Sequence, residues 1–598
     1  MYRRCVRDAL LDDLDVYQRD AVVSAAAPLA IIAPAGSGKT RVLTRRIAYR
    51  VRNATAEARH VLAVTFTRRA AAELVDRIGR LGVDGPVTAG TFHAVALAQL
   101  RRHATEHNRE PPRILDRKAR LLGPLVGGKG AAATLTLADL AAEIEWAKAR
   151  MVSPERYELA TRAVARRLSR PAAEIAEVYA RYEAEKRRRH LLDFDDVLRR
   201  CTDAIETDDG FAAGQRWRFR HLFVDEFQDA TPLQLRLLRA WLGPNPDLTA
   251  VGDPAQAIYG FAGADAAPLL EFDRAFDGGT TVALARNYRS TPAIVAVAEA
   301  ALASVDTGAR VRPTAVRPDG DRPTIAVYDG DDAEAGAVAD ACRQAYTSGV
   351  PWHRLAVLFR TNAQSARFEA AFAARGIPCR VTDQQRFVTR PAVRVLLERL
   401  DAMRREAPAH AFGELLADLA ADDELCRTDD LRSHRDALLE LGRDYLALEA
   451  GTGGVTGFAA WLDVATRPAG GAGVDLVTFH KAKGLEWDVV FVTGLERGLV
   501  PISWAGSPEA RAEERRLLHV ALSRALDTLH CSWARTRTVG RRIVPREPSP
   551  WLAALELEAR AATARRRAPR EHIEELRATL AGASPPAPPP SRARRLRG

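Results

Sequence analysis

The sequence predicts an α/β fold made of two parallel-sheet domains, each interrupted by a helical insertion. Short apolar strand patterns alternate with helical patterns in two separate blocks, as expected where helices cover both faces of a parallel sheet. Each block is broken by a long stretch of helical pattern, residues 98–190 in the first and residues 399–473 in the second. The length of 598 residues leaves room for several domains of this kind.

In the first block, a strand ends at Ile31 and Ile32, and a helix starts near Arg41. Residues 60–66 (HVLAVTF) form the next expected strand, and RRAAAELVDRIGRL forms a helix. Residues 98–190 are basic and free of strand signals. The alternation then resumes in LLDFDDVLRR, HLFVDEFQD and LTAVGD. Continuous apolar runs of this length are typical of strands buried on both faces.

The second block repeats strand–helix–strand from RLAVLFRT to GIPCRVTD and adds strands in VDLVTFH and WDVVFVTG. The helical stretch 399–473 lies between these two halves and ends in RPAGGAG, a flexible linker by composition. Residues 552–598 are expected to be helical at first and then to end in a disordered tail rich in Pro and Arg.

The turn after the first strand is suited to binding phosphate. Gly36 and Gly38 allow backbone N–H groups to approach an anion, and the following helix N-terminus attracts negative charge. Lys39 would reach the β- and γ-phosphates of a nucleotide, and the Thr40 hydroxyl would bind Mg²⁺. The phosphate-binding pattern usually begins with Gly, and here that residue is Ala33. The whole candidate loop is Ala33, Pro34, Ala35, Gly36, Ser37, Gly38, Lys39 and Thr40.

The rarity of lysine supports a special role for Lys39. The chain has 81 Arg and only 7 Lys, so a Lys in this loop indicates a need for a compact point charge. The alternative is an ordinary strand–turn–helix corner with an incidental Lys.

Composition narrows the class of protein. A net charge of +11 and an isoelectric point near 9.6 favour a polyanionic partner, although an Arg-rich solvated surface would give the same balance. The six cysteines form no C-x-x-C pair, which indicates a reducing compartment without structural disulfides, zinc or iron–sulfur centres. Without a signal-peptide core or an apolar stretch of membrane-spanning length, we expect a cytoplasmic protein with no membrane partner.

Two further motifs could complete a nucleotide-hydrolysis site. In FVDEFQD, Asp225 and Glu226 end an apolar strand, where Asp225 could hold Mg²⁺ and Glu226 could activate water. A plain acidic helix cap is the alternative. In AVGDPAQAIYGFAGA, Gln256 could sense the γ-phosphate beside Tyr259 and Phe261, unless both rings belong to the core.

Taken together, these motifs resemble those of superfamily 1A DNA helicases of the UvrD/Rep/PcrA type. The matches run in the family's order through residues 11–545. They comprise YQRDAV (Q motif), TFTRRAAAEL (Ia), GTFHAVALAQL (Ib), DEFQD (II), GDPAQAIY (III), NYRSTPAIV (IV) with RTNAQSARFEAAF after it, VTFHKAKGLEW (V) and EERRLLHVALSRA (VI). The resemblance implies two RecA-like P-loop NTPase domains.

It also implies roles at the nucleotide. Gln18 would read adenine, Arg41 and Tyr288 would sandwich it, and Glu486 would hold the ribose. Arg289 and Arg524 would be two arginine fingers, which suits charge that develops on a transferred phosphoryl group. The implied catalytic set is Lys39, Glu226, Gln256, Arg289 and Arg524.

Single-stranded DNA would follow a path of aromatic and polar side chains, on which bases can stack without regard to sequence. The residues implied are Phe66, Thr91, His93, Tyr259, Phe261 and His480. Arg69 stands in motif Ia where the family has Lys.

The implied domains are a first RecA-like domain (1–97 and 191–286) with insertion 98–190, and a second (287–398 and 474–551) with insertion 399–473.

Three departures from the family are visible. Phe261-Ala262-Gly263-Ala264 replaces the usual Trp-Arg-Gly-Ala, Ser523 replaces Thr in motif VI, and the insertion 399–473 is less than half the usual size. No nuclease-like carboxylate box follows motif VI, which argues against a helicase–nuclease subunit.

We therefore expect an ATP- and Mg²⁺-dependent 3′→5′ helicase and translocase on single-stranded DNA. Its substrates would include junctions of single- and double-stranded DNA. Its partners would be repair or replication proteins, and it would be located at the nucleoid. The polarity comes from the resemblance alone. Two alternatives stay open. The first is an ATP-gated DNA clamp or adaptor without turnover, but the presence of the implied catalytic residues argues against it: Glu226, Gln256, Arg289 and Arg524. The second is an RNA-directed translocase.

Overall fold

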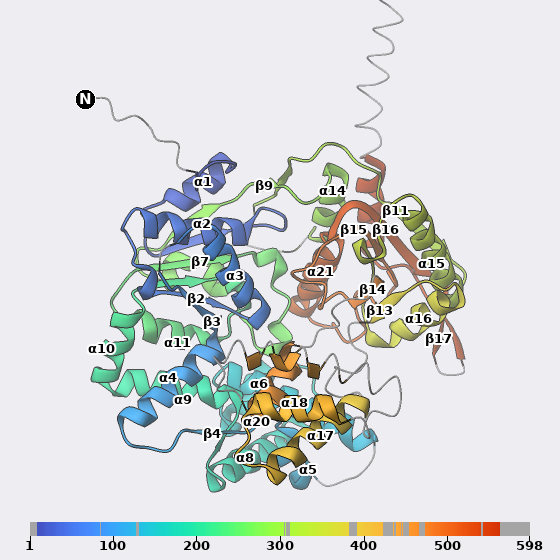
Figure 1. Cartoon of the computed structure of the whole chain (residues 1–598). Helices are drawn as coiled ribbons and strands as arrows, with labels where there is room; N and C mark the ends of the chain where they lie inside the picture. The colour runs from blue at the N-terminus through green and yellow to red at the C-terminus, as the bar shows by residue number, and fades with distance from the viewer. Residues whose placement is uncertain are drawn as a thin grey trace, which may run out of the picture.

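The structure is a computed structural model that describes residues 9–83, 85–126, 131–303, 305, 311–381, 391–422, 435, 438–439, 441–443, 445–446, 454–465, 473–539 and 542–561. Two six-stranded parallel sheets lie apart from each other, with helices on both faces of each (Figure 1). This arrangement confirms the predicted α/β fold. Among the described helices, none combines the length and apolar character that crossing a bilayer would require.

The first sheet has the order β3-β2-β6-β7-β1-β8. Leu29 and Ile31 of β1 face one core cluster, while Ala30 and Ile32 face the other, because successive side chains of a strand point to opposite faces. The strands are β1 (Leu29–Ile32), β2 (Val61–Thr65), β3 (Thr88–Thr91), β6 (His221–Val224), β7 (Leu248–Gly252) and β8 (Thr280–Ala283).

Helices α1 (Val16–Val23), α2 (Lys39–Arg52) and α3 (Arg68–Arg80) cover one face of this sheet. The opposite face packs against α4 (Phe92–Glu106), α9 (Phe194–Thr207), α10 (Asp209–Arg218), α11 (Pro232–Leu242) and α13 (Phe272–Ala275); the short α12 (Ala267–Leu270) precedes α13.

The second sheet has the order β11-β16-β15-β12-β14-β13. Its strands are β11 (Thr324–Tyr328), β12 (Leu355–Phe359), β13 (Cys379–Val381), β14 (Val474–Thr478), β15 (Trp487–Val492) and β16 (Ala525–Ala534). Helices α14 (Pro292–Ala301) and α21 (Pro508–Leu522) lie on the side toward the first sheet, and α15 (Asp331–Thr347) and α16 (Ser365–Ala374) lie on the outer side (Figure 1). A helix over residues 552–561 packs with α14 and α21.

Helices dominate both insertions. The first contains α5 (Ala119–Val126), α6 (Ala131–Ala149), α7 (Tyr157–Ala163) and α8 (Ala172–Arg188) around its own core. The second contains α17 (Pro391–Glu406), α18 (Phe412–Ala421) and α20 (Val455–Ala465) around another core. The expected boundaries 98 and 399 fall inside α4 and α17, so neither coincides with the end of an element.

Short strands account for the remaining differences from the sequence analysis. Stretch 98–190 was expected to be free of strands, which is wrong, because β4 (Arg113–Ile114) pairs in parallel with β5 (Leu191–Leu192). A two-residue strand is too short to produce a periodic pattern. The other short pairs are β9 (Arg286–Asn287) with β10 (Thr314–Ala315), and β17 (Thr536–Val539) with β18 (Arg542–Pro545).

Buried lysines join the first insertion to the first sheet's helices. Lys148 Nζ lies 2.7 Å from Asp193 Oδ1 and 2.6 Å from Asp196 Oδ1, and Lys186 Nζ lies 2.9 Å from Asp193 Oδ2. Burial alone would raise the pKa of Asp193, but the two lysine charges hold it well below its usual range. Asp193 also caps α9 through Asp196 N, so the cluster ties α6 and α8 to the start of α9. Removing one partner of such a buried pair costs about 3–5 kcal/mol.

Candidate functional site

The loop after β1 has the shape predicted for binding phosphate. Gly36 (φ 73°) and Gly38 (φ 86°) adopt left-handed conformations, and Gly38 is the N-cap of α2. A Cβ on Gly36 would lie 2.7 Å from both Arg289 Cβ and Asn287 Nδ2. The second glycine has a similar constraint, because a Cβ there would lie 2.9 Å from Gln18 Nε2. Larger residues would therefore disturb both the loop and its neighbours.

The side-chain amine of Lys39 is buried without a hydrogen-bond acceptor. Its Nζ makes no hydrogen bond and lies 3.8 Å from Glu226 Oε1 and 3.9 Å from Asp253 Oδ2. The buried Ser37 hydroxyl oxygen of the same loop also lacks a hydrogen-bond partner. Buried polar atoms are rarely left unpaired, so these two fit a ligand rich in acceptor oxygens, such as a nucleotide phosphate.

The predicted carboxylates follow β6, which lies between β2 and β7 in the sheet, one strand away from β1. Asp225 is buried, and its Oδ1 accepts a hydrogen bond from Glu226 N at 3.0 Å. Burial and the Glu226 charge raise the pKa of Asp225. For Glu226, burial is outweighed by Lys39 and Lys483, which lower its pKa and keep it ionised. Of the two carboxylates, Glu226 is therefore the one that stays ionised next to the cations of the site.

The surroundings hold Glu226 in a strained backbone conformation. This residue has φ 52° and ψ 40°, an uncommon conformation for a residue other than glycine. Gln228 Nε2 donates to Glu226 Oε2 at 2.6 Å and so orients the carboxylate. Strain of this kind persists where the surroundings hold the residue firmly, as functional sites do.

A hydrogen-bonded chain crosses from the first sheet to the second. Gln256 Nε2 donates to Asp253 Oδ2 at 2.5 Å, and Gln256 Oε1 accepts from Arg524 Nη2 at 3.3 Å. Burial and the nearby Arg289 lower the pKa of Arg524 to about 9, so its guanidinium is still charged at neutral pH. The predicted γ-phosphate sensor and one predicted finger thus touch.

The last residue of β9 and the residues that follow it hold the loop from the other side. Asn287 Nδ2 donates to Ala35 O at 2.8 Å, and Tyr288 N donates to Gly36 O at 2.8 Å. Asn287 Oδ1 accepts from Arg289 N at 2.9 Å, so one side chain positions both the loop and the second predicted finger. Arg289 Nε bonds Glu486 Oε2 at 2.7 Å. Sequence reasoning missed Asn287, although it stands first in NYRSTPAIV.

Lys483 is a second missed residue. Its Nζ donates to Asp229 Oδ2 at 2.6 Å and to Gln256 O at 2.7 Å, and it lies 4.0 Å from Glu226 Oε2. The neighbouring carboxylates outweigh burial and raise its pKa. The rarity of lysine that singled out Lys39 could have singled out Lys483 as well.

The residues expected at the adenine surround the start of α1. Gln18 Nε2 donates to Ser37 O of the loop at 2.9 Å, and Arg41 Nη2 donates to Asp13 O at 2.9 Å. The Tyr288 hydroxyl donates to Asp15, the N-cap of α1. Gln18, Arg41 and Tyr288 therefore border the loop, while Glu486 is held by Arg289.

Three predicted DNA-contacting rings lie together between the sheets. Tyr259 and Phe261 have ring centroids 6.2 Å apart, and Phe261 and His480 have centroids 5.6 Å apart. Phe261 is 54% exposed, and its carbonyl accepts from Arg166 Nη2 of the first insertion at 3.0 Å. The Phe261 ring is thus a free surface rather than core.

The other predicted DNA residues lie around the start of α4. Phe66 packs against the core of the first sheet, with its ring centroid 5.7 Å from that of Phe92. The Thr91 hydroxyl caps α4 by accepting from Ala94 N at 3.2 Å. His93 meets Phe194 edge-on at 6.1 Å. Each side chain already has a structural partner.

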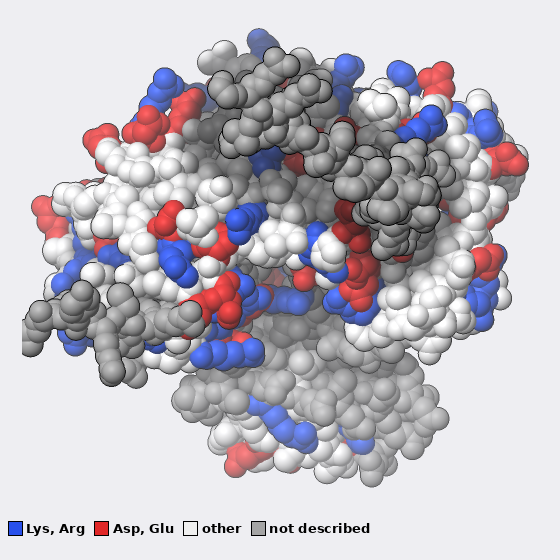
Figure 2. Space-filling model, turned by 90° about the horizontal axis from the view of Figure 1, so that it is seen from above, with Lys and Arg blue, Asp and Glu red and all other residues white. Residues whose placement is uncertain are grey.

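Charges of both signs mix on the face of the molecule that Figure 2 shows. Lys/Arg and Asp/Glu side chains are interspersed over the described residues in Figure 2. Residues 562–598, which lie outside the described residues, contain nine Arg against three Glu and so hold +6 of the net +11.

Comparison with known proteins places this site in a family. The model described as the UvrD/REP helicase N-terminal domain matches residues 14–277, and the UvrD-like helicase C-terminal domain matches residues 282–446 and 467–536. The chain is 38% identical over 584 residues to the ATP-dependent DNA helicase UvrD2 of Mycobacterium tuberculosis H37Rv, covering 93% of this chain and 83% of that protein.

Two further relatives agree. Identity is 30% over 666 residues with the ATP-dependent DNA helicase UvrD1 of Mycobacterium leprae (89% of this chain, 84% of that protein). It is 27% over 651 residues with the ATP-dependent DNA helicase PcrA of Leuconostoc citreum (92% and 86%). The chain therefore belongs to the UvrD/Rep helicase family and is a helicase of the UvrD type.

Proposed function

We propose that this helicase hydrolyses Mg²⁺·ATP between its two sheets and uses the energy to move 3′→5′ along single-stranded DNA. The observation that carries the proposal is the buried amine of Lys39, which makes no hydrogen bond and lies beside the Gln256–Arg524 contact. A cation on the first sheet and an arginine from the second would then meet the same phosphate chain, so binding would draw the two sheets together.

The loop would hold the nucleotide. Backbone N–H groups from Gly36 to Thr40 and the Lys39 amine would bind the β- and γ-phosphates. Thr40 and Asp225 would hold Mg²⁺, which when bound neutralises charge on the phosphate oxygens. Gln18, Arg41, Tyr288 and Glu486 would enclose the base and ribose.

Hydrolysis would follow from the charges described above. Glu226, ionised and fixed by Gln228, would orient the attacking water and accept its proton. Arg289 and Arg524 would stabilise charge that develops on the transferred phosphoryl group. The charge that Arg524 keeps at neutral pH suits a purely electrostatic role.

Strand movement would be coupled through the segment from Gln256 to Phe261. Gln256 touches Arg524, and three residues later Tyr259 begins the aromatic path that Phe261 and His480 extend. A change in the Gln256–Arg524 contact would therefore shift the rings on which bases stack. We extend the proposal to junctions of single- and double-stranded DNA and to a role with repair or replication proteins.

The test combines two assays on the full chain. ATP hydrolysis should be stimulated by poly-dT far more than by poly-U, and a 3′-tailed duplex should be unwound in preference to a 5′-tailed one. Stimulation without unwinding of either duplex would favour a clamp or adaptor. Equal stimulation by both polymers would favour a translocase that does not distinguish RNA from DNA, and preference for the 5′ tail would reverse the polarity.

A further inference from the structure

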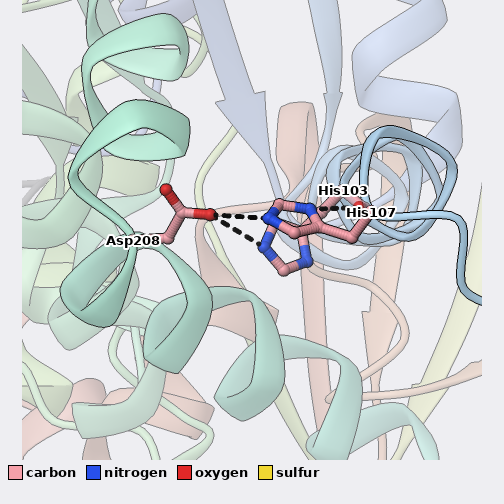
Figure 3. A group of neighbouring side chains, drawn as sticks. All are labelled: His103, His107 and Asp208. Atoms are coloured by element: carbon pink, nitrogen blue, oxygen red, sulfur yellow. Dashed lines mark hydrogen bonds and ion pairs between the residues drawn. The ribbon is translucent and has the colours of Figure 1, made fainter.

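Two histidines and an aspartate meet at the far end of α4 from the aromatic path. His103 and His107 are one helical turn apart and point toward Asp208, the residue between α9 and α10 (Figure 3). Asp208 Oδ2 lies 3.3 Å from His103 Nε2 and 3.3 Å from His107 Nε2. The three potential ligand atoms lie within 4.8 Å of one another.

We propose that His103, His107 and Asp208 form a binding site for a divalent transition metal ion, zinc by preference. The three side chains would supply three ligands, and solvent would supply the fourth. The site is separate from the nucleotide site and does not depend on the function proposed above.

Hydrogen bonds prepare two of the three ligands. His107 Nδ1 donates to His103 O at 2.9 Å, and since a carbonyl can only accept, the proton sits on Nδ1. With Nδ1 engaged in this way, Nε2 is the ring nitrogen that faces Asp208 and could bind an ion there. Asp208 Oδ1 accepts from Phe211 N at 2.9 Å as the N-cap of α10, which leaves Oδ2 for the histidines. Metal sites commonly orient their ligands in this way.

The two separations that involve Asp208 suit tetrahedral zinc. Zinc binds His nitrogen and carboxylate oxygen at about 2.0–2.2 Å, which places neighbouring ligands about 3.3–3.6 Å apart. The two 3.3 Å separations from Asp208 Oδ2 match that spacing. A direct charge-assisted hydrogen bond would be shorter, about 2.7–2.9 Å, as in the 2.6 Å His221 Nδ1–Asp247 Oδ2 contact of the same chain.

The ligand set also selects the metal. Imidazole nitrogens favour zinc, copper, nickel and iron, whereas Mg²⁺ prefers oxygen ligands. The cluster of Glu183, Asp193 and Asp196 has similar spacing, but Lys148 and Lys186 already neutralise it. At the histidine cluster, His107 is 39% exposed, so an ion could enter from solvent.

The surroundings give the site a rigid base. The His103 ring lies 4.6 Å from Phe211 of α10, whose side chain belongs to the core of the first sheet. A bound ion would tie the last turn of α4 to the corner between α9 and α10. The same helix begins at Thr91, beside His93 of the proposed DNA path.

The test uses the nucleotide-free full chain, dialysed against a chelator and then titrated with Zn²⁺ in excess Mg²⁺. We expect one saturable zinc per chain, read out by competition with a chromophoric chelator. His107→Ala and Asp208→Asn should each weaken binding by more than about 100-fold, because even residues that only orient a ligand change metal affinity by about 10–100-fold. Asn also caps helices, so Asp208→Asn should keep α10 folded.

His410→Ala is the matched control. His410 Nδ1 lies 3.3 Å from Asp418 Oδ2 in an exposed pair that has one imidazole instead of two. All variants keep the same cysteines, so binding by thiols cancels in the comparison. Zinc binding that is absent in the wild type, that survives both His107→Ala and Asp208→Asn, or that falls equally in His410→Ala would overturn the proposal and leave a hydrogen-bonded charge cluster.

Discussion

The two sheets contribute differently to the space between them. The first presents groups that follow directly from the carboxyl ends of neighbouring strands: Lys39 after β1, Asp225 after β6 and Asp253 after β7. The second reaches across with Lys483 and Arg524, which follow β14 and α21. One side presents groups at strand ends, and the other supplies positive charge from across the gap. Under the proposed function, holding nucleotide and timing its hydrolysis would be tasks of different sheets.

Removing the fixed base should have the largest effect. Glu226→Gln should lower ATP turnover by up to about 10⁴-fold, because the amide keeps the shape but cannot take a proton. Affinities for ATP and for oligo-dT should stay close to wild type. Steady-state hydrolysis and equilibrium binding measure the two properties, and turnover within a few-fold of wild type would show that Glu226 is not the base.

Removing a charge from the opposite sheet should come next. Arg524→Ala should lower kcat by about 10³-fold with a much smaller change in nucleotide affinity, since its contact strengthens in the transition state. Arg524→Lys should rescue poorly, because a point charge cannot reproduce the guanidinium fork. If only KM changed, both sheets would serve binding and the division of labour would fail.

The bridge between the sheets should have an intermediate effect. Lys483→Ala leaves Asp229 buried without its ion-pair partner, so the sheets should close less readily. We expect the DNA-stimulated kcat to fall about 10- to 100-fold. Arg497→Ala is the control, because Arg497 forms an exposed pair with Glu547 that contributes little. Equal effects of the two changes would remove Lys483 from the coupling path.

Phe261→Ala should act on the strand and spare the chemistry. The oligo-dT concentration for half-maximal stimulation should rise about tenfold, since stacking contributes about 1–3 kcal/mol per base. The rate without DNA should fall far less. Trp217→Ala, at another exposed ring (63%), should leave both unchanged. A parallel loss of both rates in Phe261→Ala would make this ring part of the scaffold.

The smallest expected effect concerns pH. Burial and Arg360 lower the pKa of His480 to about 4, so the ring is neutral at neutral pH and gains a proton only as pH falls toward 4. Its contact with DNA would therefore be stacking rather than charge pairing. The ratio of oligo-dT affinities of wild type and His480→Gln should stay constant from about pH 8 to about pH 5.5. A ratio that grows below about pH 6.5 would indicate a charged contact.

The sequence predicted the parts of this molecule that depend on local pattern. The strands that precede Lys39 and Asp225 are continuous apolar runs, and the two loop glycines that were expected to let the backbone approach an anion adopt left-handed conformations. Strands β3, β8, β11 and β16 were not predicted. β3 (TAGT) and β8 (TTVA) have no continuous apolar run, and their place comes from pairing with strands distant in the chain.

Long-range contacts were the harder part of the site. Nothing near Asn287 in the sequence indicates that its amide bonds Ala35, which is 252 residues away. The links from Lys483 to Asp229 and from Arg524 to Gln256 likewise require the positions of both sheets. In the cluster of His103, His107 and Asp208, the first and the last residue are 105 positions apart, so no local sequence motif indicates it.

The buried lysines described above affect how the protein can be labelled. Of its seven lysines, three in the first insertion (Lys118, Lys148 and Lys186) are paired with carboxylates, and Lys39 and Lys483 pair with carboxylates that follow strands of the first sheet. All five side chains are no more than 12% exposed. Among the lysines that the structure describes, only Lys481 is exposed, directly beside His480. An amine-reactive fluorophore on Lys481 would therefore lie next to the proposed strand path and perturb the motion it was meant to report. A cysteine introduced on the outer helix α15 is the better attachment site for a fluorophore in single-molecule experiments.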